Sequence, residues 1–308
     1  MKKNLQTAVI GSGLMGHGIA LVLARAGQYV RVTDPSNTAR ATLPKRVADS
    51  LTALGVSAPD AARILKKIEV SATVSAAVHD AAFVIEAGPE NLSVKHKIFA
   101  EIESHAPDDA ILASNTSVIQ ITKIMQHLNN KQRALGTHWW NPPHMIPLVE
   151  VIKTEWTTPQ VAQDMFDLLA DAGKTPVMVE KDVPGFIGNR LQHALWREAI
   201  SLVENGICDA QAVDTVIKAS FGRRLAVLGP LENADLVGTD LTLDIHENVL
   251  FDLEGRKGPS PYLQKLVAEG RLGMKSGQGF RTWTDEEASA TRARVGTHLQ
   301  RLEGILKD

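Results

Sequence analysis

The sequence predicts an α/β fold, a doubly wound, mostly parallel Rossmann-type sheet followed by an all-helical C-terminal domain. Three observations support this prediction. Short apolar runs alternate with amphipathic helical segments up to about residue 180, a pattern typical of parallel βαβ units. The first apolar run leads into a glycine-rich turn, GSGLMG, at residues 11–16. From Phe186 onward the pattern indicates helices only.

The composition is that of an ordinary globular protein. The 308 residues are 44% hydrophobic and 22% charged, enough for two domains. A net charge of −2 gives no reason to expect nucleic acid or an acidic membrane as partner. The single cysteine, Cys208, excludes an internal disulfide and a cysteine-based zinc site. We expect a cytoplasmic protein without a metal site, and no apolar run approaches the ~18 residues that a membrane span needs.

The glycine turn has the features of a dinucleotide-binding loop. A buried strand at 5–10 precedes it and an apolar helical pattern follows. Gly11 permits the tight turn, Gly13 lets the backbone approach a pyrophosphate, and Gly16 lets the helix pack closely on the strand. Free N–H groups at the start of the helix favour the negative charge of the pyrophosphate.

The end of the next strand, 29–33, indicates which dinucleotide binds. Asp34 follows this strand at the distance from the glycine turn where a carboxylate accepts hydrogen bonds from the adenine ribose. A carboxylate there would repel a 2′-phosphate, and no arginine follows before Arg40. The predicted cofactor is therefore NAD rather than NADP.

The rest of the first domain continues the alternation of strands and helices. Strands are expected at 82–85, 110–113, 133–137, 148–152 and 176–179, and helices at 37–54, 58–67, 92–102, 118–128 and 159–169. Four polar residues, Ser114 to Ser117, follow one strand at its carboxyl end, where open α/β sheets bind ligands. They are also suited to cap the helix expected at 118–128.

The alternation of expected strands and helices ends near Val183. We place the boundary there, with an NAD-binding domain at 1–183 and a helical substrate and dimerisation domain at 184–308. Helices are expected at 186–205, 210–220, 231–253 and 261–269, and a last helix from Thr284.

His138 is the leading candidate for a catalytic base, because an imidazole can take up and return a proton at neutral pH. Glu150 lies in an apolar strand between Val149 and Val151, and an acid in that setting needs a partner. The alternative is a structural histidine beside Trp139 and Trp140 in the core.

Several ordered motifs resemble those of the 3-hydroxyacyl-CoA dehydrogenase family over nearly the whole chain. They are GSGLMGHGIA, VIEAGPENLSVK, ASNTS, GTHWWNPP followed by PLVEV, KDVPGFIGNR, GPLENADLVG and GRLGMKSGQGF. The resemblance implies that His138 is the general base and Glu150 its orienting acid, and that Ser117 and Asn189 bind the substrate oxygens. It also implies that Glu90 and Lys95 lie along the nicotinamide ribose. The full set of residues expected to bind the cofactor is Gly11, Gly13, Leu14, Met15, Gly16, Asp34, Glu90, Lys95 and Asn115.

The family implies oxidation of a 3-hydroxyacyl-CoA to its 3-keto product in fatty acid metabolism, by a homodimer formed through the C-terminal domain. Two features depart from it. Trp139-Trp140 stands where the family commonly has Phe-Phe, and Arg223-Arg224 precedes Gly229. Both are similar to the branch that oxidises small hydroxy acids without CoA, such as gulonate and carnitine dehydrogenases.

Three functions follow from these features. The main one is an acyl-CoA dehydrogenase, and the second is the same chemistry on a free 3-hydroxy acid held by an arginine. The third is a non-catalytic cofactor-binding protein of the kind the family supplies to eye lenses. The presence of His138, Glu150, Ser117 and Asn189 together argues against that third function.

Overall fold

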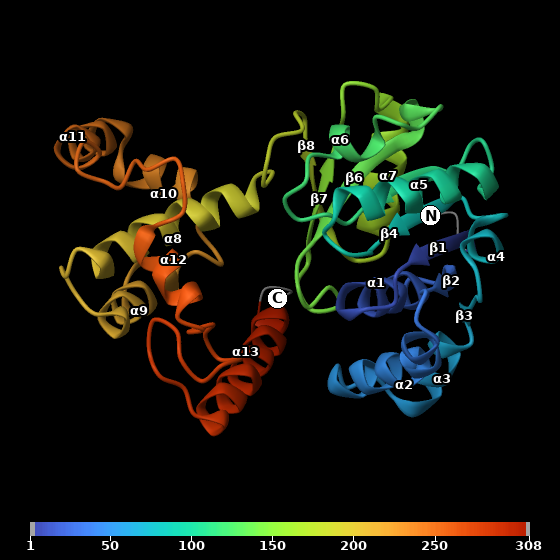
Figure 1. Cartoon of the computed structure of the whole chain (residues 1–308), viewed down its shortest axis with the longest axis horizontal. Helices are drawn as coiled ribbons and strands as arrows, with labels where there is room; N and C mark the ends of the chain where they lie inside the picture. The colour runs from blue at the N-terminus through green and yellow to red at the C-terminus, as the bar shows by residue number, and fades with distance from the viewer. Residues whose placement is uncertain (1–3, 306–308) are drawn as a thin grey trace. The chain divides into compact units, whose positions relative to one another are not determined.

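The computed structural model describes residues 4–305 and divides into two compact units. The first comprises the residues up to 190 together with the end of the last helix from 299, and the second comprises residues 191–298. Figure 1 shows the strands confined to the first unit, while helices and connecting loops make up the second. The predicted fold class is confirmed.

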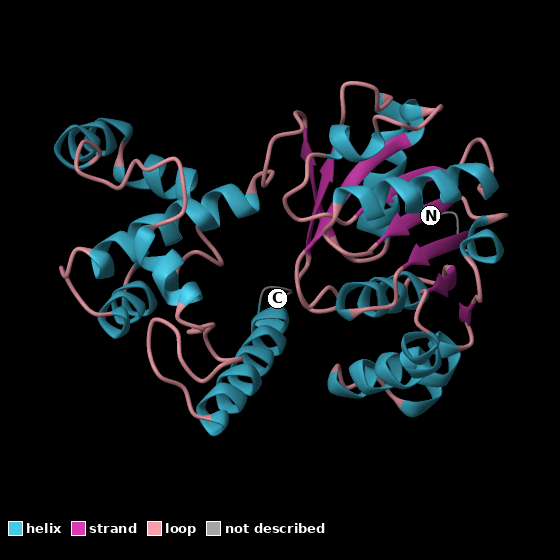
Figure 2. Cartoon of the chain, viewed as in Figure 1, coloured by secondary structure: helices cyan, strands magenta, loops and turns pink. Residues whose placement is uncertain are grey.

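The first unit is built on one eight-stranded sheet with the order β3-β2-β1-β4-β5-β6-β7-β8 (Figure 2). Every neighbouring pair is parallel except β6 and β7, which are antiparallel. The strands are β1 Gln6–Ile10, β2 Tyr29–Thr33, β3 Ile68–Val70, β4 Phe83–Glu86, β5 Ile111–Ser114, β6 Ala134–Trp139, β7 Leu148–Ile152 and β8 Thr175–Val179.

Helices connect the strands and form most of the second unit. In the first unit they are α1 Leu14–Arg25, α2 Asn37–Ala53, α3 Ala58–Leu65, α4 Val74–Val78, α5 Leu92–His105, α6 Ile121–Met125, η1 Lys131–Arg133 and α7 Pro159–Asp171. From there on they are α8 Gly188–Glu204, α9 Ala210–Ala219, η2 Phe221–Arg223, α10 Pro230–Val237, α11 Thr239–Val249, α12 Pro261–Ala268 and α13 Asp285–Ile305.

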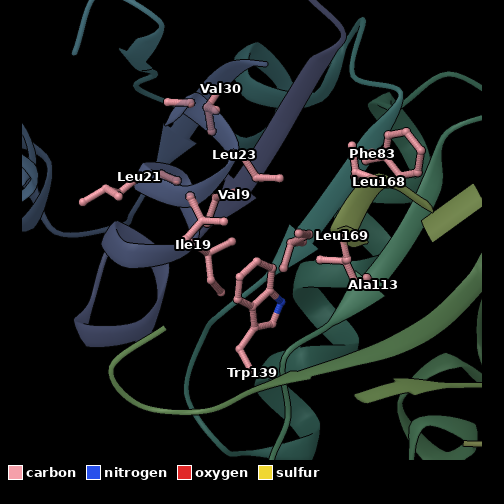
Figure 3. Packing of buried hydrophobic residues seen from close by; sticks show 14 of the residues in the cluster. Val9, Ile19, Leu21, Leu23, Val30, Phe83, Ala113, Trp139, Leu168 and Leu169 are labelled. Carbon is pink, nitrogen blue, oxygen red and sulfur yellow. The ribbon is translucent and has the colours of Figure 1, made fainter. Parts of the chain in front are cut away.

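Side chains alternate between the two faces of the sheet and form two separate cores. Val9 and Ile85 pack with helices α1, α2, α3 and α7 on one face (Figure 3). Ala8 and Val84, one residue earlier on the same strands, pack with α4, α5 and α6 on the other. Burial on both faces explains why these strands are continuous apolar runs in the sequence.

The structure adds two elements that were not expected and corrects two that were. Strand β3 and helix α4 were not predicted, because β3 has only three residues, two of them exposed, and α4 has only five. The helix expected at 118–128 is reduced to α6. The helix expected at 231–253 is divided into α10 and α11 at Gly238, whose φ of 104° is a backbone conformation that other residues rarely adopt.

The second unit exposes many large apolar side chains. Leu231, Leu236 and Phe251 are 80%, 72% and 82% exposed in the isolated chain. In residues 4–305, no helix combines the length and the apolar character required to cross a bilayer.

Candidate active site

The glycine turn has the geometry expected of a dinucleotide-binding loop. Gly11 has a φ of 104°, and a Cβ added to it would lie 2.6 Å from the carbonyl oxygen of Ala87. A Cβ on Gly16 would lie 1.8 Å from the carbonyl oxygen of Gly11, so helix α1 contacts the turn through bare backbone. A Cβ on Gly13 would meet no atom within 4 Å, which leaves open space beside the loop.

The start of α1 is suited to an anion. Gly13 is the N-cap and provides no side-chain cap, and the first turn contains no acidic residue. The N–H groups and dipole at this end therefore favour a pyrophosphate. Of the two other loop residues expected to bind the cofactor, Leu14 is 65% exposed and Met15 packs against the core.

Asp34 connects the end of β2 to the glycine turn. Its Oδ2 accepts hydrogen bonds from the N–H and the Oγ of Ser12, at 2.8 and 3.2 Å. Its Oδ1 accepts the N–H of Ser36 at 2.9 Å. The carboxylate is only partly buried, so it keeps accessible lone pairs for ribose hydroxyl groups.

His138 and Glu150 face each other across the antiparallel strands β6 and β7. They are directly paired in register, and Nδ1 of His138 lies 2.7 Å from Oε2 of Glu150. Both side chains are buried. Oε1 of Glu150 accepts two further hydrogen bonds, from the N–H groups of Ile187 and Gly188 at 2.8 and 3.0 Å.

These contacts keep Glu150 ionised. Burial acts to raise the pKa of Glu150, but the hydrogen bonds from His138, Gly188 and Ile187 outweigh it and the pKa is lowered. An ionised Glu150 requires a proton on Nδ1 of His138, which leaves Nε2 as the nitrogen that can accept a proton.

The two tandem tryptophans have different positions, and only one of them lies beside the base. Trp139 is 2% exposed and packs in the core near Ile19 and Leu169 (Figure 3). Trp140 lies beside the base, with its ring centre 5.3 Å from that of His138. Strand β6 ends at Trp139, whose side chain points away from that of His138 because neighbouring residues of a strand point to opposite faces.

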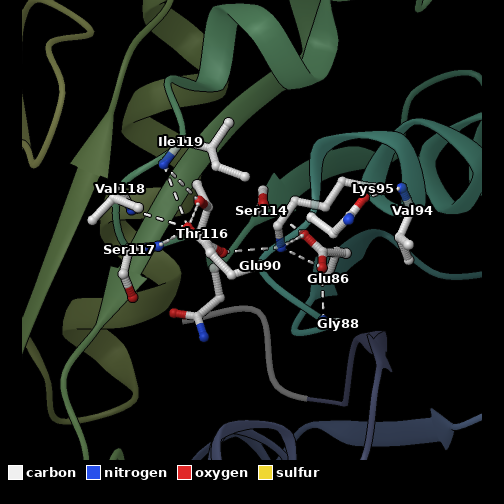
Figure 4. Close-up of polar contacts among 12 residues, drawn as sticks. Glu86, Gly88, Glu90, Val94, Lys95, Ser114, Thr116, Ser117, Val118 and Ile119 are labelled. Carbon is white, nitrogen blue, oxygen red and sulfur yellow. Dashed lines mark hydrogen bonds and ion pairs between the residues drawn. The ribbon is translucent and has the colours of Figure 1, made fainter. Parts of the chain in front are cut away.

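The residues after β5 form a loop organised by Glu90. One carboxylate oxygen of Glu90 accepts the Thr116 hydroxyl at 2.5 Å and the N–H groups of Ser117 and Val118, each at 3.1 Å (Figure 4). Burial acts to raise the pKa of Glu90, but these hydrogen bonds and the charge of nearby Lys95 have the larger effect. The pKa of Glu90 is therefore lowered. Residues 117–119 form a bend held by these bonds, and α6 begins only at Ile121.

Two of the expected substrate contacts meet at this loop. Nδ2 of Asn189 donates to the carbonyl oxygen of Ser117 at 2.9 Å, although the two residues are 72 positions apart. The Ser117 side chain is exposed. Asn115 places its Oδ1 2.9 Å from the N–H of Trp139, so this expected cofactor ligand also fixes the end of β6.

Lys95 is buried, and its expected place along the nicotinamide ribose stays a prediction. It is 0% exposed, and its Nζ donates to both carboxylate oxygens of Glu86 at 2.8 and 2.9 Å. Glu86 also accepts the Ser114 hydroxyl at 2.6 Å (Figure 4). Nζ of Lys95 also lies 3.7 Å from Oε2 of Glu90, so Lys95 connects the two acids Glu86 and Glu90.

The sequence reasoning missed the role of Glu86. The signal was available, because an acid that ends a wholly buried strand, FVIE, needs a cationic partner. A pair of histidines was also missed. His17 and His144 lie with ring centres 5.9 Å apart, His17 contacts the carbonyl oxygen of Gly13 at 3.1 Å, and Nδ1 of His144 is buried without a hydrogen-bond partner.

Within the described part of the chain, no group of three or more His, Cys, Asp or Glu side chains is arranged to hold a metal ion. The chemistry available at the site is therefore a proton acceptor with its counter-charge, beside a loop that fits a dinucleotide.

Comparison with known proteins identifies related chains. Residues 6–183 match the model for the NAD binding domain of 3-hydroxyacyl-CoA dehydrogenase, and residues 185–283 match the model for its C-terminal domain. The chain is 38% identical over 303 residues to 5-formyl-3-hydroxy-2-methylpyridine 4-carboxylate 5-dehydrogenase of Mesorhizobium japonicum, which covers 97% of both chains. It is 39% identical over 286 residues to the mitochondrial hydroxyacyl-coenzyme A dehydrogenase of Homo sapiens, covering 88% of this chain and 89% of that protein.

One solved structure is similar over almost the whole length. It is a crystal structure of 5-formyl-3-hydroxy-2-methylpyridine 4-carboxylic acid 5-dehydrogenase, an NAD+-dependent dismutase. The TM-score is 0.91 at 35% identity, covering 98% of this chain and 99% of that one.

Proposed function

Because this chain belongs to the 3-hydroxyacyl-CoA dehydrogenase family and is an NAD-dependent oxidoreductase of that type, we propose that it oxidises a small carboxylate-bearing substrate that carries no CoA. The reacting group is a hydroxyl, which an aldehyde also presents in its hydrated form. His138 is the base, and NAD held by Asp34 and the glycine turn would supply the hydride acceptor.

One observation favours a small acid over an acyl-CoA. Identity does not separate the two kinds of relative, since it is 38% to the pyridine carboxylate dehydrogenase and 39% to the human acyl-CoA enzyme. Structural similarity does separate them. The TM-score is 0.91 to the pyridine carboxylate dehydrogenase, but 0.77 to a (S)-3-hydroxybutyryl-CoA dehydrogenase of Ralstonia eutropha and 0.69 to a 3-hydroxyacyl-CoA dehydrogenase of Archaeoglobus fulgidus.

The environment of His138 is consistent with an aromatic or compact substrate. Trp140 is only partly buried and its ring is tilted 54° to the imidazole, so it offers an aromatic edge or face beside the base. The pyridine ring named for the relative is a substrate of this shape.

The proposed reaction uses the chain's own residues for binding, orientation and proton transfer. Asp34 and the glycine turn hold NAD, which supplies a hydride acceptor when bound. Nε2 of His138 takes the proton from the substrate hydroxyl as its C–H hydride departs. Glu150 stabilises the imidazolium that forms, and Ser117 with Asn189 positions the substrate oxygens.

The second candidate is the 3-hydroxyacyl-CoA reaction, favoured by both family matches and by the human relative. A panel of substrates separates the two functions. We expect the pyridine carboxylate or a free 3-hydroxy acid to form NADH with a kcat/KM about 100-fold above that of 3-hydroxybutyryl-CoA. The opposite order would establish the acyl-CoA reaction.

Arg223 or Arg224 is proposed to bind the substrate carboxylate. Both are exposed, and a guanidinium matches a carboxylate through two parallel hydrogen bonds. Replacing the responsible arginine by methionine should raise KM for the acid about 10- to 100-fold, the worth of a charged hydrogen bond. Arg292, an exposed arginine on α13, is the matched control, and an unchanged KM in both variants would refute the clamp.

A homodimer through the second unit is also proposed. Exposed side chains such as Leu231 and Phe251 are typical of an interface that a partner copy covers. Light scattering at micromolar concentration should give about twice the 33.3 kDa chain mass, and a monomer mass would contradict this assembly.

A further inference from the structure

The segment immediately before α8 has an unusual backbone. Gly185 has a φ of 75° and Phe186 a φ of 51°, so two consecutive residues are left-handed. Glycine adopts this conformation freely, but for a bulky aromatic residue it is a strained outlier. Such strain persists only where the surrounding contacts outweigh it, and it is concentrated at functional sites.

The left-handed turn directs two N–H groups at one oxygen. The residues that follow it, Ile187 and Gly188, both donate to Oε1 of Glu150, at 2.8 and 3.0 Å. Successive N–H groups after a turn of this kind form a concave anion site, and here the anion is a carboxylate of the protein itself. The other oxygen of Glu150 is the partner of His138.

The Phe186 ring occupies the space beside the base. It is 1% exposed, and its centre lies 5.5 Å from that of His138. Glycine at this position would relieve the backbone strain but would remove the packing of the ring against the core. The burial of the ring against the core of α4, α5 and α6 is therefore what stabilises the strained conformation.

We propose that Phe186 is a positioning residue for the pair His138 and Glu150. Its buried ring anchors the left-handed turn, and the turn delivers the Ile187 and Gly188 N–H groups that fix the orientation of the Glu150 carboxylate. This role rests on the proposed function of His138 as the base.

Two substitutions separate the ring from the backbone conformation. Phe186→Gly relieves the strain and removes the ring, whereas Phe186→Leu keeps an apolar side chain and the strain. If the ring anchors the turn, Phe186→Gly should lower kcat about 10- to 100-fold with NAD affinity within twofold of the parent, and Phe186→Leu should recover much of the loss. If only the backbone conformation matters, Phe186→Gly will match or exceed the parent, which would overturn the proposal.

A second measurement needs no substrate. Amide hydrogen exchange at Ile187 and Gly188, followed by NMR, should accelerate at least tenfold in Phe186→Gly. Phe99→Ala is the matched control, because Phe99 is equally buried in the same core but lies on α5. It should lower overall stability without selectively exposing these two amides.

The two measurements distinguish the failures. Faster exchange with unchanged kcat would show that the turn does not position the base, and unchanged exchange would show that the ring does not anchor the turn. His138→Gln tests the proposed function separately. If that variant keeps full turnover, the assignment of the base fails, while the exchange result still decides whether Phe186 holds the turn.

Discussion

Asp34 binds Ser12 through one carboxylate oxygen, which accepts both the main-chain N–H and the side-chain hydroxyl of the serine. The residue expected to recognise the cofactor ribose therefore also holds the glycine turn in shape. Its two roles, charge and loop support, can be separated by mutation.

Asp34→Asn should reduce the preference for NAD over NADP without disturbing the turn. The amide oxygen can still accept from Ser12, but it no longer repels a 2′-phosphate. Asp34→Ala should lose both roles and weaken NAD binding about 10- to 100-fold, the worth of one charged hydrogen bond. Fluorescence titration with both cofactors measures this, and equal affinity of the parent for NAD and NADP would contradict the assignment.

His138→Ala should lower kcat about 10²- to 10⁴-fold while NAD binding is retained, as expected for a general base. Glu150→Gln should lose less, because the imidazole of His138 is still present as a base. Its amide oxygen can still accept from Ile187 and Gly188, but its NH₂ group would then face Nδ1 of His138 and favour the wrong tautomer. A Glu150→Gln variant less active than His138→Ala would refute this order of roles.

The stability of the protein should fall between about pH 6.5 and pH 4 because of His144. Burial, with the nearby charges of His17 and Lys174, lowers the pKa of His144 to about 4. In this pH range the unfolded chain binds a proton that the folded chain does not, so stability decreases as the pH falls and the loss is complete below the folded-state pKa. Burial likewise lowers the pKa of His17 and adds to the same trend.

The variant that tests this is His144→Leu, which removes the titrating group and the unpartnered buried nitrogen. Urea unfolding at pH 7.5, 6 and 5 should show a smaller decline than in the parent. His105→Gln, a surface histidine on α5, should leave the decline unchanged. Parallel pH dependence in His144→Leu and the parent would contradict the prediction.

Lys95→Met should destabilise the protein by about 3–5 kcal/mol, because it leaves the buried Glu86 carboxylate without its cation. The double variant Glu86→Gln with Lys95→Met should recover much of this loss, since it removes both charges. Lys45→Met, which breaks an exposed pair with Asp49, should cost no more than about 1 kcal/mol. Similar losses for Lys95→Met and Lys45→Met in urea unfolding would be inconsistent with a buried ion pair.

Local chemistry made part of this site predictable from the sequence. The glycine turn depends on neighbouring residues, and the close contact between Gly16 and Gly11 is the one expected from the motif. The sequence also indicated that Glu150 needs a hydrogen-bonding partner, because burying an unpaired carboxylate in an apolar strand costs free energy. That His138 is this partner depends on strand register, which places the two directly opposite.

Features that depend on distant contacts could not be predicted. The bonds from the N–H groups of Ser117 and Val118 to Glu90 join residues 27 and 28 positions apart, and no local pattern indicates them. Lys95 has the appearance of an exposed helical lysine until the sheet places Glu86 beside it. The two tryptophans are also adjacent residues of the same type, so the sequence does not distinguish them. The structure shows that Trp139 lies in the core and Trp140 beside His138.

That separation of Trp139 and Trp140 has a consequence for how related sequences are compared. Trp139 is constrained by its core neighbours, so changes at this position should covary with residues such as Ile19 and Leu169. Trp140 is constrained by whatever binds next to His138. In an alignment of the family, variation at position 140 should follow substrate preference among the lineages, while variation at position 139 should follow core volume and carry no information about the substrate.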